Sequence, residues 1–497
     1  MIHYNNRNTP EDGRLFPPLS SECAAVLDSI FSSVNSALPI NARFARRLPE
    51  DIAQLSRLLT FERAGLHDAY LSSDANLSAY CRYFLPWNVW RLCRLFSSTQ
   101  AAKQIEMLLL NAPFYDTLKQ PHNSQTHALK SNALQTRTPH SLFKPDSGSV
   151  PPLQEAATGG QAVLDILDIG SGPLTLPAAI WAAFPALRKK ALAIYAVDKN
   201  KKALEAGVSI FKALGGGASM WNIKTQTARL EKQLRLPPAR LVSVVNVFNE
   251  LLIHIPQADT GALMEAARRF AALLIQRTAQ EGAVFIVEPG VPRSAQFLSL
   301  LRRAFDERGW QPVLPCPCGA SCAMPGGKPG AKWCHWTLDT KDAPEKLKQI
   351  SAAAGLAKQN AMFSFLLFKE KSGASNSSAL NVGASNSGAS NSGASTKGAS
   401  ANGASNKGAS KSGVSTKTDS AGSQKKVMTV RVISNPIKLK DGLFGRYGCS
   451  QAGLTLLCGG INKLKALGSG TLYTAYCQKT DGEARRDNKS GALIINL

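Results

Sequence analysis

The sequence predicts an α/β protein with a doubly wound sheet in the middle of the chain, a helical domain before it and a small β domain after it. Three observations lead to this prediction. Residues 161–371 alternate apolar strand-like runs with amphipathic helices, residues 20–115 carry only helical periodicity, and residues 425–497 contain short β-like runs separated by Gly and Lys. At 497 residues, 44% of them hydrophobic, the chain is long enough for two or three domains.

The N-terminal part divides into three segments. Residues 1–19 are polar and rich in Asn, and we expect them to form a disordered lead. Residues 20–115 begin with a Ser/Glu pair that can cap a helix and continue with apolar residues at spacings of three and four, which predicts a helical domain. Residues 116–160 are polar and contain proline, so we interpret them as a linker.

Charge and composition narrow the function. There are 58 Lys and Arg residues against 34 Asp and Glu, a formal net charge of +24, which favours a polyanionic partner such as nucleic acid. The first residues form no apolar signal segment, and no run of 18 apolar residues follows, so we expect neither secretion nor membrane spanning. We therefore expect a cytoplasmic location, where the ten cysteines would remain reduced.

The central segment reads as repeated βαβ units. Each strand is a short apolar run, and each helix that follows carries an amphipathic pattern, as in a parallel sheet covered on both faces. The last strand-like run closes the series after a cysteine-rich insertion. The strands are predicted at 163–169, 191–198, 241–251, 282–290, 310–315 and 361–370, and the main helices at 201–214, 260–279 and 294–309.

A glycine-rich turn follows the first of these strands. Asp168, Gly170 and Gly172 stand where a class I (Rossmann-like) methyltransferase fold places its loop for S-adenosylmethionine, and Asp198 ends the second strand, where it can accept hydrogen bonds from a ribose. An NAD enzyme would use a similar acid, but the third glycine that a pyrophosphate needs is absent. Leu174 replaces the last glycine of the methyltransferase pattern, so we expect it to crowd the methionine end.

The strand predicted at 241–251 should end beside the reacting groups of a methyltransferase site. Asn249, near its end, is our further candidate for a residue that binds the cofactor. The chain has no Asp/Asn-Pro-Pro-aromatic turn for amino methylation and no cysteine placed for cytosine C5 methylation. Glu250 and Glu288 could act as a base, contact the cofactor or cap the structure. The catalytic residues are therefore left unassigned.

Residues 315–336 contain four cysteines, at 316, 318, 322 and 334, in a stretch rich in Gly and Pro. Such a segment could be a redox pair, a disulfide framework or a metal centre. The flexible backbone and the reducing compartment favour a metal, but the spacing fits no standard zinc ribbon and leaves the ion open between zinc and iron–sulfur.

Two segments of different character end the chain. In residues 372–424 the triplet GAS recurs every five residues and no aromatic residue occurs, which predicts a flexible low-complexity linker. Residues 425–497 carry twelve Lys or Arg against four acids, a composition suited to a phosphate backbone.

Taken together, these motifs resemble the methyltransferase-like family of the mitochondrial ribosomal small subunit and its bacterial relatives, described as predicted rRNA methylases. The resemblance is carried by LDIGSGPLT, AVDKN, NEL, VEPGVPRS, the cysteine segment ending WCHW, SFLLFKE and RVISNPIKLKDGLFGRYGCS. It is good over 160–460 and weak over 20–115. It implies a role in small-subunit assembly and translation, contact with small-subunit rRNA, and a [4Fe–4S] cluster held by four cysteines.

Transferred position by position, the resemblance implies that the cluster ligands are Cys316, Cys322, Cys334 and Cys449. Cys318 becomes an extra thiol, and Cys458 is a weaker substitute for Cys449. The leading hypothesis is an rRNA-binding small-subunit assembly factor in which the cluster is structural. The alternative is an active S-adenosylmethionine-dependent rRNA methyltransferase. The sequence predicts no oligomeric state.

Overall fold

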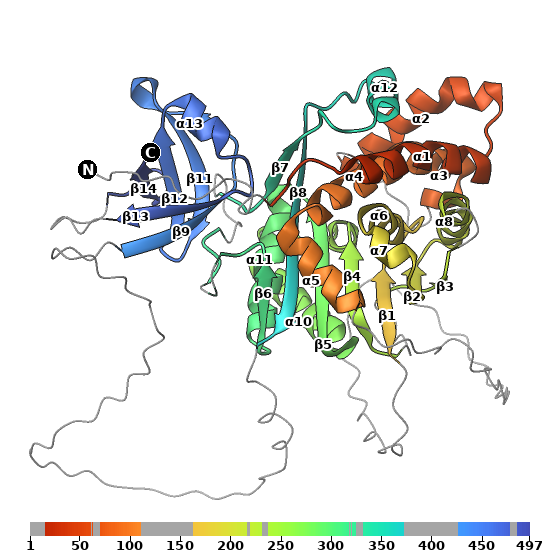
Figure 1. Ribbon diagram of the computed structural model, residues 1–497, viewed down its shortest axis with the longest axis horizontal. Helices are drawn as coiled ribbons and strands as arrows, with labels where there is room; N and C mark the ends of the chain where they lie inside the picture. The colour runs from red at the N-terminus through yellow and green to blue at the C-terminus, as the bar shows by residue number, and fades with distance from the viewer. Residues whose placement is uncertain are drawn as a thin grey trace, which may run out of the picture.

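The computed structural model describes residues 15–60, 62, 70–110, 163–215, 219–230, 237–317, 319, 321–324, 332–371, 426–477 and 485–497. The predicted linker and the predicted GAS segment lie outside these residues, as do Cys318 and most of the predicted lead. The described chain forms two sheets with their helices, and Figure 1 shows the smaller C-terminal sheet beside one end of the larger one.

The N-terminal segment is helical, as its periodicity predicts. Its first helix starts at Ser20, whose hydroxyl accepts the Cys23 N–H at 3.2 Å and so caps the helix. The fourth α-helix is buried almost all round, including Trp87 and Trp90, because it lies between the other helices and the sheet. The elements are α1 (Ser21–Ala37), α2 (Ala42–Thr60), η2 (Tyr70–Ser72), α3 (Asp74–Ala79), the π-helical η3 (Tyr80–Phe84), α4 (Leu85–Phe96) and α5 (Thr99–Leu110).

The end of the predicted disordered lead is packed. Leu15 is fully buried and Phe16 is 7% exposed, with the Phe16 ring 5.8 Å from that of Trp336 and 5.4 Å from that of Phe363. A Cβ at Gly470 would lie 2.7 Å from the Leu15 side chain, so the C-terminal sheet also contacts this segment. The boundary at residue 19 is therefore too late, because these two apolar side chains fill a space between parts of the fold that are distant in sequence.

The larger sheet has the order β3-β2-β1-β4-β5-β8-β6, with β7 paired to β8. Strands β1 to β5 are parallel, whereas β8 runs antiparallel to β5, β6 and β7. One reversed strand between the fifth and sixth is the arrangement of the class I methyltransferase fold, as predicted. The strands are β1 (Leu164–Ile169), β2 (Leu192–Asp198), β3 (Trp221–Thr227), β4 (Ala239–Val245), β5 (Thr278–Pro289), β6 (Trp310–Leu314), β7 (Trp336–Asp339) and β8 (Asn360–Glu370).

Helices cover both faces of this sheet, which explains why its central strands are apolar on both sides (Figure 1). In β1, Ile166 packs into the core shared with the N-terminal helices, whereas Leu164 and Leu167 pack into the core of α10 and α11. The helices are α6 (Thr175–Ala183), α7 (Pro185–Arg188), α8 (Lys201–Leu214), α9 (Phe248–Leu251), α10 (Thr260–Gln276), α11 (Pro292–Asp306) and α12 (Glu345–Ala353).

The second sheet has the order β13-β9-β11-β12-β14, with the short β10 paired to β11. Its neighbours are antiparallel except for β12 and β14, which are parallel. We call residues 426–497 the C-terminal β unit. Its elements are β9 (Lys426–Val432), β10 (Ile437–Lys438), η4 (Lys440–Gly442), β11 (Phe444–Ser450), β12 (Gly453–Gly459), α13 (Ile461–Ala466), β13 (Leu472–Cys477) and β14 (Leu493–Asn496).

Polar contacts join the C-terminal β unit to the rest. The Thr337 N–H donates to Ser469 Oγ at 3.2 Å, and Arg431 donates to the Gln100 side chain in α5 at 3.2 Å. The cysteine segment leaves β6 at this junction and returns into β7, so it lies where the two sheets meet. Among the described helices, none is long and apolar enough to cross a membrane.

Candidate functional site

The first candidate site is a cavity at the carboxyl ends of β1, β2 and β4, where ligands of open α/β sheets bind. Including its open mouth and the solvent in it, the cavity has a volume of about 740 Å³. The N-terminal helical segment closes one side of it. The lining residues used below are Tyr70, Tyr80, Gly170, Gly172, Asp198, Lys199, Asn246, Val247 and Glu250.

The glycine turn forms the floor of this cavity. Gly170 has φ +72°, and a Cβ there would lie 2.1 Å from Cγ2 of Val247, so only glycine fits. Gly172 has φ +54°, and a Cβ there would meet no atom within 4 Å. Glycine is therefore favoured at position 172 by the backbone angle, and it leaves space on the cavity side.

Leu174 does not crowd the cavity, contrary to the sequence expectation. It adopts φ +58° at the start of α6, is fully buried, and packs into the core shared with the N-terminal helices. Leu174 does not line the cavity. The missing glycine therefore affects the backbone conformation and not the space for a ligand.

Asp198 is held rigidly at the end of β2. One carboxylate oxygen accepts the Gly172 N–H at 2.8 Å and the other accepts the Asn200 N–H at 2.7 Å. Burial raises the pKa of Asp198, while these backbone hydrogen bonds oppose the rise. The carboxylate thus ties the turn to β2 and presents its remaining lone pairs to the cavity.

Asp168 lies behind the turn and does not line the cavity. It is 1% exposed, and Oδ1 accepts a hydrogen bond from the Ser243 hydroxyl at 2.7 Å. Its Oδ2 has no hydrogen-bond partner among the described atoms, and burial raises the pKa of Asp168 to about 6. A buried acceptor left open next to the glycine turn fits a ligand or water that donates from the cavity side.

Asn249 is also placed behind the cavity, where it supports the turn after β4. Glu288 is fully buried and accepts the backbone N–H groups of Val247, Phe248 and Asn249 at 2.8 to 3.0 Å. With its amide oriented to satisfy both polar atoms, Asn249 donates to Asn246 O and to Glu288. Of the roles left open for Glu288, the structure favours capping, since it holds the start of α9.

Glu250 lines the cavity and is bonded from two sides. The Tyr70 hydroxyl donates to one carboxylate oxygen at 3.1 Å, and Lys199 Nζ donates to the other at 3.2 Å. Burial raises the pKa of Glu250, and Lys199 is the main influence that lowers it. No sequence motif marks Tyr70, which reaches this site from the N-terminal segment, 180 residues away from Glu250.

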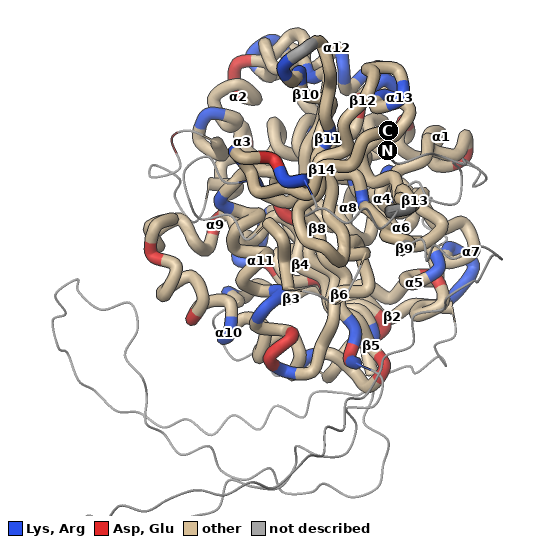
Figure 2. The backbone as a smooth tube through the Cα atoms, turned by 90° about the vertical axis from the view of Figure 1, so that its left-hand side faces the viewer, with Lys and Arg blue, Asp and Glu red and all other residues tan. Residues whose placement is uncertain are grey.

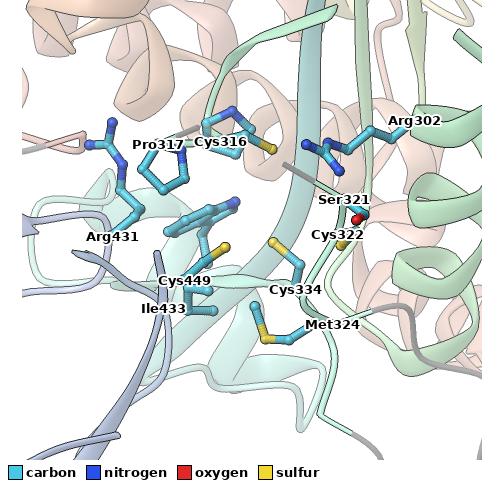
Figure 3. Close-up of a pocket in the computed structure, with 12 residues that line it drawn as sticks. Arg302, Cys316, Pro317, Ser321, Cys322, Met324, Cys334, Arg431, Ile433 and Cys449 are labelled. Carbon is cyan, nitrogen blue, oxygen red and sulfur yellow. The ribbon is translucent and has the colours of Figure 1, made fainter. Parts of the chain in front are cut away.

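The second candidate site is a cavity at the junction of the two sheets (Figure 3). All four cysteines that the resemblance implies as ligands line it, namely Cys316, Cys322, Cys334 and Cys449. Figure 3 shows their side chains around a common space. Within the described chain, no group of three or more Cys, His, Asp or Glu side chains is arranged to hold a metal ion.

Of Cys449 and Cys458, only Cys449 is among the described residues that line the cavity. Cys449 lies on β11 opposite Arg431 of β9, and both line the cavity. Cys458 lies on β12 in a separate apolar cluster and does not line it. Burial raises the pKa of Cys334 well above its usual value, and the thiols of Cys322, Cys316 and Cys449 raise it further.

Two buried arginines share this cavity with the thiols. Arg431 is 4% exposed and Arg302 is 7% exposed, and no Asp or Glu is among the cavity's described lining residues. Arg431 donates to Gly470 O at 3.0 Å as well as to Gln100, while its Nε has no hydrogen-bond partner among the described atoms. Four thiols and two guanidinium groups therefore line one cavity.

Comparisons with solved structures find methyltransferases of low similarity. A 16S rRNA methyltransferase, KamB, is 16% identical over 42% of this chain and 89% of its own, with a TM-score of 0.27. NSun6 from Pyrococcus horikoshii is 14% identical over 42% and 48%, with a TM-score of 0.27. A precorrin-6y C5,15-methyltransferase from Geobacter metallireducens is 15% identical over 43% and 81%, with a TM-score of 0.25. The fold assignment rests on the strand order and not on these scores.

A family model gives the more specific finding. No curated protein matches the chain. Residues 159–390, which include β1 to β8 and the cysteine segment, match the model described as mitochondrial small ribosomal subunit Rsm22. Through these residues the chain is similar to the family of the mitochondrial small ribosomal subunit protein Rsm22.

Proposed function

We propose that the chain is an rRNA-binding factor of the ribosomal small subunit, acting in its assembly and in translation, and that a [4Fe–4S] cluster joins its methyltransferase-like sheet to the C-terminal β unit. The observation that carries the proposal is the junction cavity, which is lined by Cys449 of the C-terminal β unit and by Cys316, Cys322 and Cys334 of the cysteine segment. The similarity to a small-subunit protein family supports the ribosomal small subunit as the partner. The net charge of +24 supports RNA as the ligand. A cytoplasmic location is part of the same proposal.

The donor set fits the cluster in type and in charge. Four thiolates are the usual ligands of a [4Fe–4S] centre, and such a centre with its ligands is anionic. Arg302 and Arg431 supply positive charge within the same cavity, where burial would otherwise make an anion costly. Zinc held by the same thiols is the alternative ion.

Anaerobic purification with iron and sulfide determination tests the cluster. We expect about four iron and four sulfide per chain. Cys449→Ser should lose the iron, whereas the control Cys458→Ser should keep it, because Cys458 lies outside the cavity. Stoichiometric zinc without iron in the native chain would show that the cluster assignment is wrong. Equal iron in the two variants would show that Cys449 is not a ligand.

The cavity at the carboxyl ends of β1, β2 and β4 fits S-adenosylmethionine. Gly170 and Gly172 would allow close approach of the ligand, Asp198 would accept hydrogen bonds from the ribose hydroxyls, and the open oxygen of Asp168 lies next to the turn. When bound, the cofactor supplies an electrophilic methyl group. Calorimetric titration should detect binding that Asp198→Ala weakens.

A second candidate function is methyl transfer to rRNA. It is favoured by Glu250, a partly buried carboxylate in the cavity wall that could accept a proton. The test compares small-subunit rRNA from strains that carry the native chain and Asp168→Ala, by mass spectrometry of digested RNA. A modified nucleotide that disappears in the variant would establish the enzyme. Unchanged rRNA together with loss of cofactor binding would favour the assembly factor.

A further inference from the structure

The C-terminal β unit has the topology of an OB-fold. If β9, β11, β12, β13 and β14 are taken as strands 1 to 5, their order in the sheet is 4-1-2-3-5. Strands 3 and 5 are parallel, and the helix α13 lies between strands 3 and 4. This is the arrangement of the partly open five-stranded OB barrel, a fold that binds oligonucleotides.

OB-folds bind their ligands on the outer face of strands 2 and 3, between the loop that joins strands 1 and 2 and the loop that joins strands 4 and 5. Here these are the first loop, residues 433–443, and the second loop, whose described part is residues 485–492. The two meet over this face, because Ile437 and Leu439 share an apolar cluster with Ala492 and Tyr447. Figure 2 is turned so that the C-terminal β unit faces the viewer.

Both loops are positively charged. Together, residues 433–443 and 485–492 contain five basic and two acidic residues, a net charge of +3. The five basic side chains are all exposed, and they are Lys438, Lys440, Arg485, Arg486 and Lys489. Asp487 is engaged within its own loop, where it accepts hydrogen bonds from the Ser490 N–H and hydroxyl. The cations are therefore available to phosphates.

The face between the loops offers no ring for base stacking in its described part. Tyr447 is 8% exposed, and Lys332 Nζ lies 4.8 Å from the centre of its ring. The neighbouring Leu456 and Cys458 are buried beneath the loops. Aromatic stacking is what gives many OB-folds their contact with bases, so a ligand here would be held through its backbone.

We propose that these two loops form a clamp that binds single-stranded RNA through its phosphates, without base preference. The inference rests on the proposed RNA-binding function and adds to it the place and the mode of binding. Lys332, from the cysteine segment, extends the clamp, because it lies over Tyr447 and lowers the pKa of Asp487 after the stronger effect of Ser490. The clamp thus spans the C-terminal β unit and the edge of the cysteine segment.

Fluorescence anisotropy with labelled RNA tests the clamp in the full chain. The probes are oligo(U) and oligo(A) of about 20 nucleotides and a duplex of about 20 base pairs, each titrated over a range of salt. The test variants are K438E/K440E in the first loop and R485E/R486E in the second loop. The matched control is K463E/K465E, which reverses two exposed lysines of α13 in the same unit.

Each loop variant should weaken binding of both single strands by about tenfold or more at ~0.1 M salt and lower the salt slope by about 1.4, the loss of two phosphate contacts. The α13 control should change affinity less than about threefold. Oligo(U) and oligo(A) should bind alike, and the duplex should bind more weakly. Equal losses in all three variants, no loss in the loop variants, or a duplex bound as tightly as the single strands would overturn the clamp.

Cosedimentation separates this inference from the proposed function. If the native chain binds small subunits while the loop variants bind the oligonucleotides as the native chain does, the clamp is wrong and the proposed function stands. If the native chain binds neither small subunits nor their extracted rRNA, the proposed function is wrong. Circular dichroism of each variant should match the native chain, because all four loop side chains are exposed.

Discussion

Arg431→Met in the cysteine cavity should weaken the chain with its cluster bound and leave the metal-free chain almost unchanged. Burial lowers the pKa of Arg431 to about 10, which corresponds to a cost of about 3 kcal/mol for keeping the charge inside. Replacement by Met removes this cost and also removes hydrogen bonds to Gly470 and Gln100, worth ~1 kcal/mol each. In the metal-free chain the two effects nearly cancel.

With an anionic cluster in the cavity, the same substitution also removes an attraction. A unit positive charge and a unit negative charge ~7 Å apart, at an effective dielectric constant of ~20, attract by about 2 kcal/mol. The difference in the free energy of unfolding between the loaded and the metal-free chain should therefore fall by about that amount. Because the folded pKa lies near 10, Arg431 stays protonated at neutral pH, and the effect should not vary between pH 6 and 8.

Arg446→Met is the matched control. Arg446 is 3% exposed, burial lowers its pKa to about 10, and it donates to Ser434 O and Leu464 O, but it does not line the cavity. Anaerobic urea unfolding, with and without the reconstituted cluster, gives the difference between loaded and metal-free chains for each variant. Only Arg431→Met should reduce this difference. The same reduction in both variants would show that cavity electrostatics is not the cause.

Two further predictions concern the methyltransferase-like sheet. Gly170→Ala should destabilise the chain by ~2 kcal/mol or more in urea unfolding, because its Cβ has no space, whereas Gly172→Ala should cost ~1 kcal/mol from its backbone angle alone; equal costs would contradict the packing described. Burial raises the pKa of Glu288 from 4.5 to about 8, so the folded chain binds more protons than the unfolded chain between these values, and stability should fall as pH rises from 5 to 8. Glu288→Gln should flatten that slope, and an unchanged slope would show that Glu288 does not titrate in this range.

Strong local patterns made most of the fold predictable. The strands β1, β4 and β5 are buried on both faces and are therefore mostly apolar, and the glycine turn keeps its sequence signature because positive φ requires it. The edge strand β3 is different. Its sequence, WNIKTQT, is mostly polar because one side faces solvent, and our list of strands omitted it.

The cavities were predicted only where a motif marks them. Asp198 lines the cavity at the carboxyl ends of β1, β2 and β4, but Asp168 and Asn249 lie behind it, because a motif identifies a turn and not the direction of each side chain. Tyr70 and Arg431 belong to no motif. Each reaches its cavity through tertiary packing between segments far apart in the chain, which periodicity and spacing do not report. The cluster and its four ligands are still predictions.

The packing of Leu15 and Phe16 bears on how the chain matures during synthesis. These side chains are enclosed by Trp336, Phe363 and Gly470, which are synthesised more than 300 residues later. The helices and the larger sheet can form earlier from their own contacts. The packing between the two sheets can form only after the C-terminal β unit has been synthesised. A chain that stops before residue 470 would thus leave this apolar pair partly uncovered, and chaperones and proteases that bind exposed apolar residues could recognise it.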